Sequence, residues 1–144
     1  MAHKIYEIIA AIDAIDSATD SAQLQVLDHA MQEFFAVPDA ARHVQVLFRL
    51  FERFPEDDGY ESFWSILHGI ESLPNYEQEV IASVQRRASQ FPVLMINRML
   101  NAGQQRVGDI DLMRLLESVA ADTNCPESVR NDARGFIEHQ WARR

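Results

Sequence analysis

Residues Ser89 to Gly103 read SQFPVLMINRMLNAG, and this stretch decides the fold that we expect. At 100° per residue its apolar side chains cover most of a helix circumference, and a helix that is apolar nearly all round is buried. Pro92 suits the first turn of such a helix, where a missing N–H has no intrahelical partner. Gly103 suits the left-handed residue just past its end. The stretch therefore predicts a central buried helix that the rest of the chain covers.

The polar side chains inside this stretch form a narrow stripe on its last turns. They are Asn97, Arg98 and Asn101. Polar residues at the end of a buried helix usually bond to exposed carbonyls of a neighbouring helix, although a ligand site is the alternative. We therefore assign these side chains to the structural core. The full set of expected core residues is Trp64, Met95, Asn97, Arg98, Asn101 and Gly103.

The rest of the chain shows apolar residues at helical spacing, interrupted by short polar breaks. Pro38 is expected to open one helix, and Asp109 is expected to cap another. With the central stretch, these patterns predict an all-α fold of about eight helices and no convincing strand. The length of 144 residues fits a single domain over residues 1–144.

The expected helices fall into successive pairs, which suggests how they pack. After Pro38 the pairs span residues 38–73, 74–103 and 108–140. Short connections favour antiparallel neighbours, and pairs of this length are typical of HEAT or armadillo stacks. The pairs share no sequence similarity, so a compact orthogonal bundle is the alternative architecture.

The cysteine content and hydropathy indicate a soluble cytoplasmic protein. Cys125 is the single cysteine, so no intrachain disulfide can form, which fits a reducing compartment. The first residues lack the features of a signal peptide, and no uncharged stretch approaches the ~18 residues that a membrane span needs.

The net charge of −9 is distributed unevenly along the chain. Residues 1–83 hold 15 acids and 4 bases, which gives −11, whereas residues 84–144 hold 7 acids and 9 bases, which gives +2. An acidic half repels nucleic-acid phosphates and attracts basic partners. The arginines of the second half are sparse and interleaved with acids, so we expect no nucleic-acid binding. The alternative is that the acidity serves solubility alone.

The longest acidic run is also the clearest loop, at Glu56-Asp57-Asp58-Gly59. Tyr60 follows it and is a plausible interface anchor, because tyrosine is enriched among residues that dominate binding energy. The loop and its flanks are therefore the candidate partner-binding surface. Its residues are Glu52, Glu56, Asp57, Asp58, Tyr60 and Glu61, together with Asp16 and Asp20.

The chain shows no catalytic motif. His68 and Glu71 stand three apart, but di-iron bundles use the reverse order, twice, with further glutamates. Cys125 has no base that the sequence can place beside it. A Gly-rich phosphate loop and a Gly-x-Ser-x-Gly elbow are both absent. We expect no enzyme, no metal site and no cofactor.

Three blocks carry a family resemblance: Trp64-x-x-Leu67-His68-Gly69-Ile70-Glu71, then Tyr76-Glu77, then Met95-Ile96-Asn97-Arg98-Met99-Leu100-Asn101-Ala102-Gly103. Together they resemble the all-helical immunity proteins of bacterial polymorphic-toxin systems, of the contact-dependent inhibition and Rhs kind, over about half of the chain. The resemblance implies a protein that binds and blocks a cognate toxin C-terminal domain, often a nuclease. The shared residues look like scaffold, so no binding residue is carried over.

The partner that we expect is therefore a basic toxin domain, with no role for nucleic acid or a membrane. A HEAT-like adaptor that binds a non-toxin protein is the alternative.

Overall fold

The computed structural model describes the backbone of residues 2–144 and the side chains from Lys4 onward. In this part of the chain, the structure has eight α-helices, one 3-10 helix and one two-stranded ribbon, which confirms the all-α fold. The α-helices are α1 (Ala2–Asp13), α2 (Ser21–Ala36), α3 (Gln45–Arg53), α4 (Ser62–Glu71), α5 (Tyr76–Arg86), α6 (Gln90–Asn101), α7 (Leu112–Ala121) and α8 (Glu127–Ala142). The 3-10 helix η1 is Ala40–His43, and the strands are β1 (Arg106–Val107) and β2 (Ile110–Asp111).

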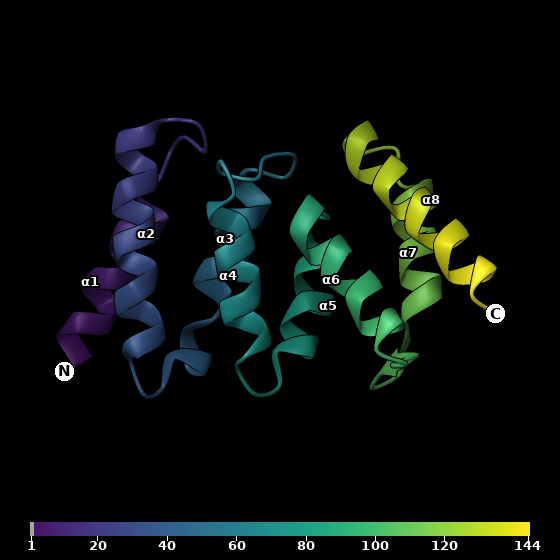
Figure 1. The fold of residues 1–144 in the computed structure, drawn as a ribbon, viewed down its shortest axis with the longest axis horizontal. Coiled ribbons are helices and arrows are strands. Elements are labelled where there is room, and N and C mark those ends of the chain that lie inside the picture. The colour runs from purple at the N-terminus through teal and green to yellow at the C-terminus, as the bar shows by residue number, and fades with distance from the viewer. Residues whose placement is uncertain (1) are drawn as a thin grey trace.

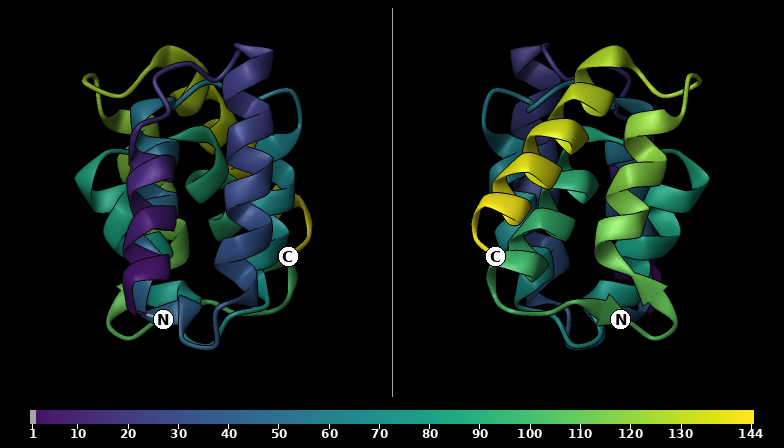
Figure 2. Two further views of the ribbon diagram at one scale, coloured as in Figure 1. Left: turned by 90° about the vertical axis from the view of Figure 1, so that its left-hand side faces the viewer. Right: turned by 90° about the vertical axis from the view of Figure 1, so that its right-hand side faces the viewer.

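The helices form four hairpins that stand side by side in one row (Figure 1). Viewed along the row, they fall into two layers (Figure 2). One layer holds the odd-numbered helices, with α1 against α3 and α3 against α5, and the other holds the even-numbered ones, with α2 against α4, α4 against α6 and α6 against α8. Successive hairpins thus pack through helices of the same layer, as in helical-repeat stacks. The stack, and not the orthogonal bundle, is the architecture observed.

Helix α6 is the central element, as the sequence predicts. It contacts α3, α4, α5, α7 and α8. Eight of its side chains are buried: Phe91, Pro92, Val93, Met95, Ile96, Asn97, Met99 and Leu100. Apolar side chains cover most of the circumference of α6, and their burial removes apolar surface from water, which stabilises the fold by about 25 cal/mol per Å².

Aromatic rings join α6 to α3 and α4, the two helices of the second hairpin. Phe91 stacks on Phe51 of α3, with ring centroids 5.4 Å apart and planes 14° apart. Phe63 of α4 meets both rings edge-on, at 5.4 Å from Phe51 and 5.8 Å from Phe91. Edge-to-face and offset-stacked pairs at these separations are favourable. This cluster fixes how the second and third hairpins pack together.

The C-terminal end of α6 has the structure that the glycine predicts. Gly103 has φ +91°, and its N–H donates to the Leu100 carbonyl at 3.0 Å. The N–H of Gln104 donates to the Met99 carbonyl at 3.0 Å. These two bonds make a Schellman motif, in which a left-handed glycine ends the helix.

The polar stripe of α6 bonds to neighbouring helices, but through side chains and not through carbonyls. Gln140 of α8 donates its Nε2–H to Asn97 Oδ1 at 2.7 Å and to Asn101 Oδ1 at 2.8 Å. Arg98 makes a two-pronged ion pair with Glu71 of α4, with both N–O distances 2.8 Å. The hydrogen bonds that Arg98 donates to Glu71 raise the pKa of Arg98 above its usual value. The stripe therefore ties α6 to α4 and α8.

Four of the six expected core residues are less buried than predicted. Met95 and Asn97 are buried, but Asn101 and Gly103 are exposed and Arg98 is partly exposed at the helix end. Trp64 is 37% exposed. It follows Phe63 on α4 and therefore lies about 100° further round the helix, where its ring meets Phe91 in a T-shaped contact at 5.2 Å between centroids.

Two helix starts also differ from the prediction. Pro38 lies in a turn before η1, and α3 begins only at Gln45, because the chain turns between the two layers there. Asp109 is in the turn of the short ribbon, in which Val107 pairs with Ile110. Asp111 caps α7 instead, by accepting from the Arg114 N–H at 3.0 Å.

Candidate interaction surface

The loops inside the four hairpins all lie along one edge of the stack (Figure 1). They are residues 14–20, 54–61, 87–89 and 122–126, and we call them the acidic edge. They contain seven acids, Asp16, Asp20, Glu56, Asp57, Asp58, Glu61 and Asp122, and one base, Arg87, which gives −6. The connections on the opposite edge, residues 37–44, 72–75 and 102–111, hold three acids and two bases, which gives −1. The fold thus gathers the acidic loops on one side.

The acids of this edge are free of ion pairs among the residues that the structure describes. Several acids on the helices, in contrast, pair with cations of a neighbouring helix. Asp13 pairs with Arg49 at 2.9 Å, and Glu33 pairs with Lys4. The acidic edge is therefore a concentration of charge that the chain itself does not neutralise.

The loop between α3 and α4 contributes most of the expected site residues. Glu56, Asp58, Tyr60 and Glu61 are exposed, and Asp57 is half-buried. The hydroxyl of Ser128, at the start of α8, donates to the Glu56 carboxylate. The N–H of Gln90, at the start of α6, donates to the Pro55 carbonyl at 2.8 Å. These bonds hold the loop against the next two hairpins along the edge.

Three consecutive residues of this loop have left-handed backbone conformations. Gly59 has φ +57°, Tyr60 +47° and Glu61 +76°. A left-handed conformation costs a residue with a side chain roughly 1–2 kcal/mol, so the surroundings must enforce it at Tyr60 and Glu61. Asp58 helps, because its carboxylate accepts from the Tyr60 N–H at 3.0 Å. The turn leaves the Tyr60 side chain 69% exposed.

The loop between α1 and α2 contributes the two less central acids. Asp20 caps α2, where its carboxylate accepts from the Ala22 N–H at 3.4 Å. Asp16 accepts from the Gln23 amide at 2.5 Å, and its own N–H donates back to Gln23 at 2.8 Å. Both acids are exposed, so they keep their charge on the edge while holding the loop in shape.

Glu52 does not belong to this surface, which corrects the sequence prediction. It lies on α3, where it accepts from the Ser83 hydroxyl at 2.7 Å and pairs with Arg86 of α5 at 2.9 Å. Its side chain is 14% exposed. The hydrogen bonds that Arg86 donates to Glu52 raise the pKa of Arg86. Sequence proximity to the acidic loop is misleading here, because Glu52 faces the neighbouring helix.

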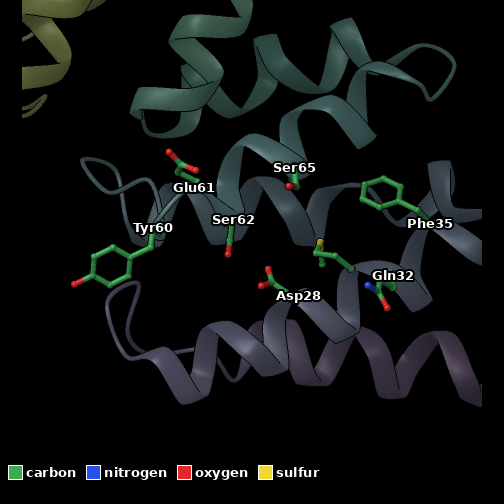
Figure 3. A pocket seen from close by; sticks show the side chains of 8 residues that line it. Asp28, Gln32, Phe35, Tyr60, Glu61, Ser62 and Ser65 are labelled. Carbon is green, nitrogen blue, oxygen red and sulfur yellow. The ribbon is translucent and has the colours of Figure 1, made fainter.

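A groove between α2 and α4 opens beside the acidic edge, and sequence reasoning missed it. Its volume is about 560 Å³, and its lining is Asp28, Met31, Gln32, Phe35, Tyr60, Glu61, Ser62 and Ser65. Asp28 of α2 and Ser62 of α4 point toward one another across it, and Tyr60 lies at one end with its ring directed away from them (Figure 3). The i, i+4 spacing of Asp28 and Gln32 indicates that both lie on one face of α2, but it does not reveal which helix lies opposite that face.

The candidates for catalysis and metal binding are not brought together. Glu71 is held by Arg98, and His68 Nδ1 is 4.0 Å from its carboxylate. Cys125 is buried, and desolvation raises the pKa of its thiol, the opposite of what an activated nucleophile requires. Among the described residues no group of three or more His, Cys, Asp or Glu side chains could hold a metal ion. None of the helices described has the length and apolarity to cross a membrane.

Comparison of the chain with protein-family models, with curated proteins and with solved structures returns no match.

Proposed function

We propose that this protein is an immunity protein, which binds a cognate bacterial toxin domain and neutralises it through the acidic edge. The observation that carries the proposal is the gathering of seven acids on one edge, none of them ion-paired within the described chain. Such a surface has the electrostatic form of a docking site for a basic protein.

A nuclease toxin would fit this surface well. Nucleases must hold phosphates, and their clefts are therefore basic. An acidic edge placed over such a cleft repels competing nucleic acid and attracts the toxin from a distance. Complementary charge raises association rates most at low ionic strength.

The shape of the protein supports a binding role as well. Helical-repeat stacks present extended surfaces, because each hairpin adds its loops to the same edge. Here hydrogen bonds at Pro55, Glu56 and Asp58 hold the loop between α3 and α4 in place. A surface that is already ordered loses less entropy when it binds a partner.

The second candidate function is that of an adaptor for a non-toxin protein. The stacked hairpins favour it, because HEAT-like stacks are widely used as binding scaffolds. An adaptor and an immunity protein would share the acidic edge and differ in the partner and in the consequence of binding.

Genetic context and toxicity separate the two functions. An immunity gene is expected directly downstream of a large toxin gene. We expect the C-terminal domain of that toxin to be lethal when produced alone, to be harmless when this protein is produced with it, and to co-purify with it. A neighbouring product that is not lethal, or lethality that this protein does not relieve, would contradict the immunity function.

A further inference from the structure

We propose that the groove between α2 and α4 receives an arginine side chain of the protein partner. This inference rests on the proposed function, which supplies a basic protein as the partner. It adds the subsite that binds one basic side chain of that partner. The groove is continuous with the acidic edge, because Tyr60 and Glu61 belong to both.

The polar groups of the groove are free to bind. None of the side chains of Asp28, Gln32, Ser62 and Ser65 hydrogen-bonds or ion-pairs with another described residue. Within the chain, other acids of these two helices are already paired, as Glu33 is with Lys4 and Glu71 is with Arg98. A ligand in the groove would therefore displace only water.

The arrangement of acceptors suits a guanidinium group. The Asp28 carboxylate and the Ser62 hydroxyl face one another across the groove, and Ser65 and Gln32 lie further along it (Figure 3). All four side chains carry oxygen acceptors, whereas arginine carries five N–H donors in a planar fork. Lysine offers a compact ammonium with three donors, which matches facing acceptors less well.

The rest of the lining suits the other parts of an arginine. Met31 and Phe35 supply apolar surface along which the methylene stem can lie. The ring of Tyr60, at one end of the groove, points away from Asp28 and Ser62 and leaves the space between them open (Figure 3). Phe35 itself is held in place by α4, because its ring lies over Gly69, where a Cβ would come within 2.3 Å of it.

The test uses the full chain labelled with 15N and two blocked tripeptides, Ac-Gly-Arg-Gly-NH2 and Ac-Gly-Lys-Gly-NH2. We expect the arginine peptide to shift the amide signals of Gln32, Ser62 and Ser65, and to bind more tightly than the lysine peptide. Asp28→Asn is expected to weaken this binding about tenfold, because a hydrogen-bonded charge is lost. Glu117→Gln, an identical charge change at an exposed position of α7, is the matched control and is expected to have no effect.

Shifts spread over the whole acidic edge, equal binding of the two peptides, or an Asp28→Asn variant that binds like the wild type would each overturn the proposal. The same variants tested with the toxin domain separate this inference from the proposed function. If Asp28→Asn leaves toxin binding unchanged, the arginine subsite is contradicted and the immunity function is not. If the groove binds the arginine peptide but the protein binds no toxin domain, the immunity function is contradicted and the arginine subsite is not.

Discussion

Gln140 of α8 donates a buried hydrogen bond of 2.7 Å to Asn97 of α6, and this bond joins the last helix of the stack to the central one. Both side chains are buried, and a buried polar group without a partner costs roughly 1–3 kcal/mol. The polar stripe that the sequence shows on α6 therefore holds α6 and α8 together.

Removal of this bond should lower the stability measurably. Asn97→Ala is expected to reduce the free energy of unfolding by about 1–3 kcal/mol, because Gln140 loses the buried one of its two partners. Urea denaturation followed by circular dichroism measures the change. Asn101→Ala, at an exposed position, is the control and should cost less. Equal losses in the two variants would contradict the claim that the buried Gln140–Asn97 bond stabilises the fold.

The aromatic cluster should be the most sensitive part of the core. Phe91→Ala removes the ring that packs on Phe51, Phe63 and Trp64. We expect a loss of about 3–5 kcal/mol in the free energy of unfolding, the usual range for a large aromatic truncated in a core. A loss under about 1 kcal/mol by urea denaturation would show that α6 is not the centre of the packing.

The contact between Phe35 and Gly69 should be specific for glycine. Gly69→Ala is expected to destabilise the protein, because the added Cβ would lie 2.3 Å from the Phe35 ring. In the background Phe35→Leu, whose side chain is smaller, the same substitution should cost less. A double-mutant cycle in urea measures the coupling, and additive effects would contradict the close approach of α2 and α4.

The carboxyl group of Asp132 on α8 predicts a pH dependence. Desolvation raises its pKa above the ordinary value, so the folded protein is destabilised once this group ionises. Its contribution to stability is present below the unfolded-state pKa and is lost as the pH rises through the folded-state pKa. Asp132→Asn should therefore raise the midpoint of thermal unfolding at pH 7 and give no gain at pH 3. Glu138→Gln, on the exposed face of α8, is the control; an equal gain there would contradict the effect of burial.

Much of the fold could be predicted, because its signals are local. The run of apolar residues from Phe91 to Leu100 specifies a buried helix whatever surrounds it. Gly103 ends that helix through its own backbone freedom. The placement of Trp64 could not be predicted, since a side chain at the border of an apolar stripe is buried or exposed according to its neighbours.

The candidate site could be predicted in part for the same reason. The acidic loop after α3 is visible as a run of charges, and Asp16 and Asp20 join it because paired antiparallel helices place alternate loops on one edge. The groove at Asp28 depends on the distance between α2 and α4, which Gly69 and Phe35 set. The assignment of Glu52 to the surface is wrong for the same reason. Its ion-pair partner, Arg86, is 34 residues away in the sequence, so the pairing that buries Glu52 has no local signal.

The central claim is that the acidic edge is the docking surface, and the association rate with the toxin domain tests it most directly. Stopped-flow fluorescence at two salt concentrations would compare the wild type with Asp57→Lys/Glu61→Lys on the acidic edge and with Asp109→Lys/Glu117→Lys, which raises the net charge equally on other surfaces. We predict that the edge variant associates at least about tenfold more slowly at low salt and loses most of its salt dependence, whereas the control changes by less than about twofold. Equal effects of the two variants, or no effect of either, would contradict the claim.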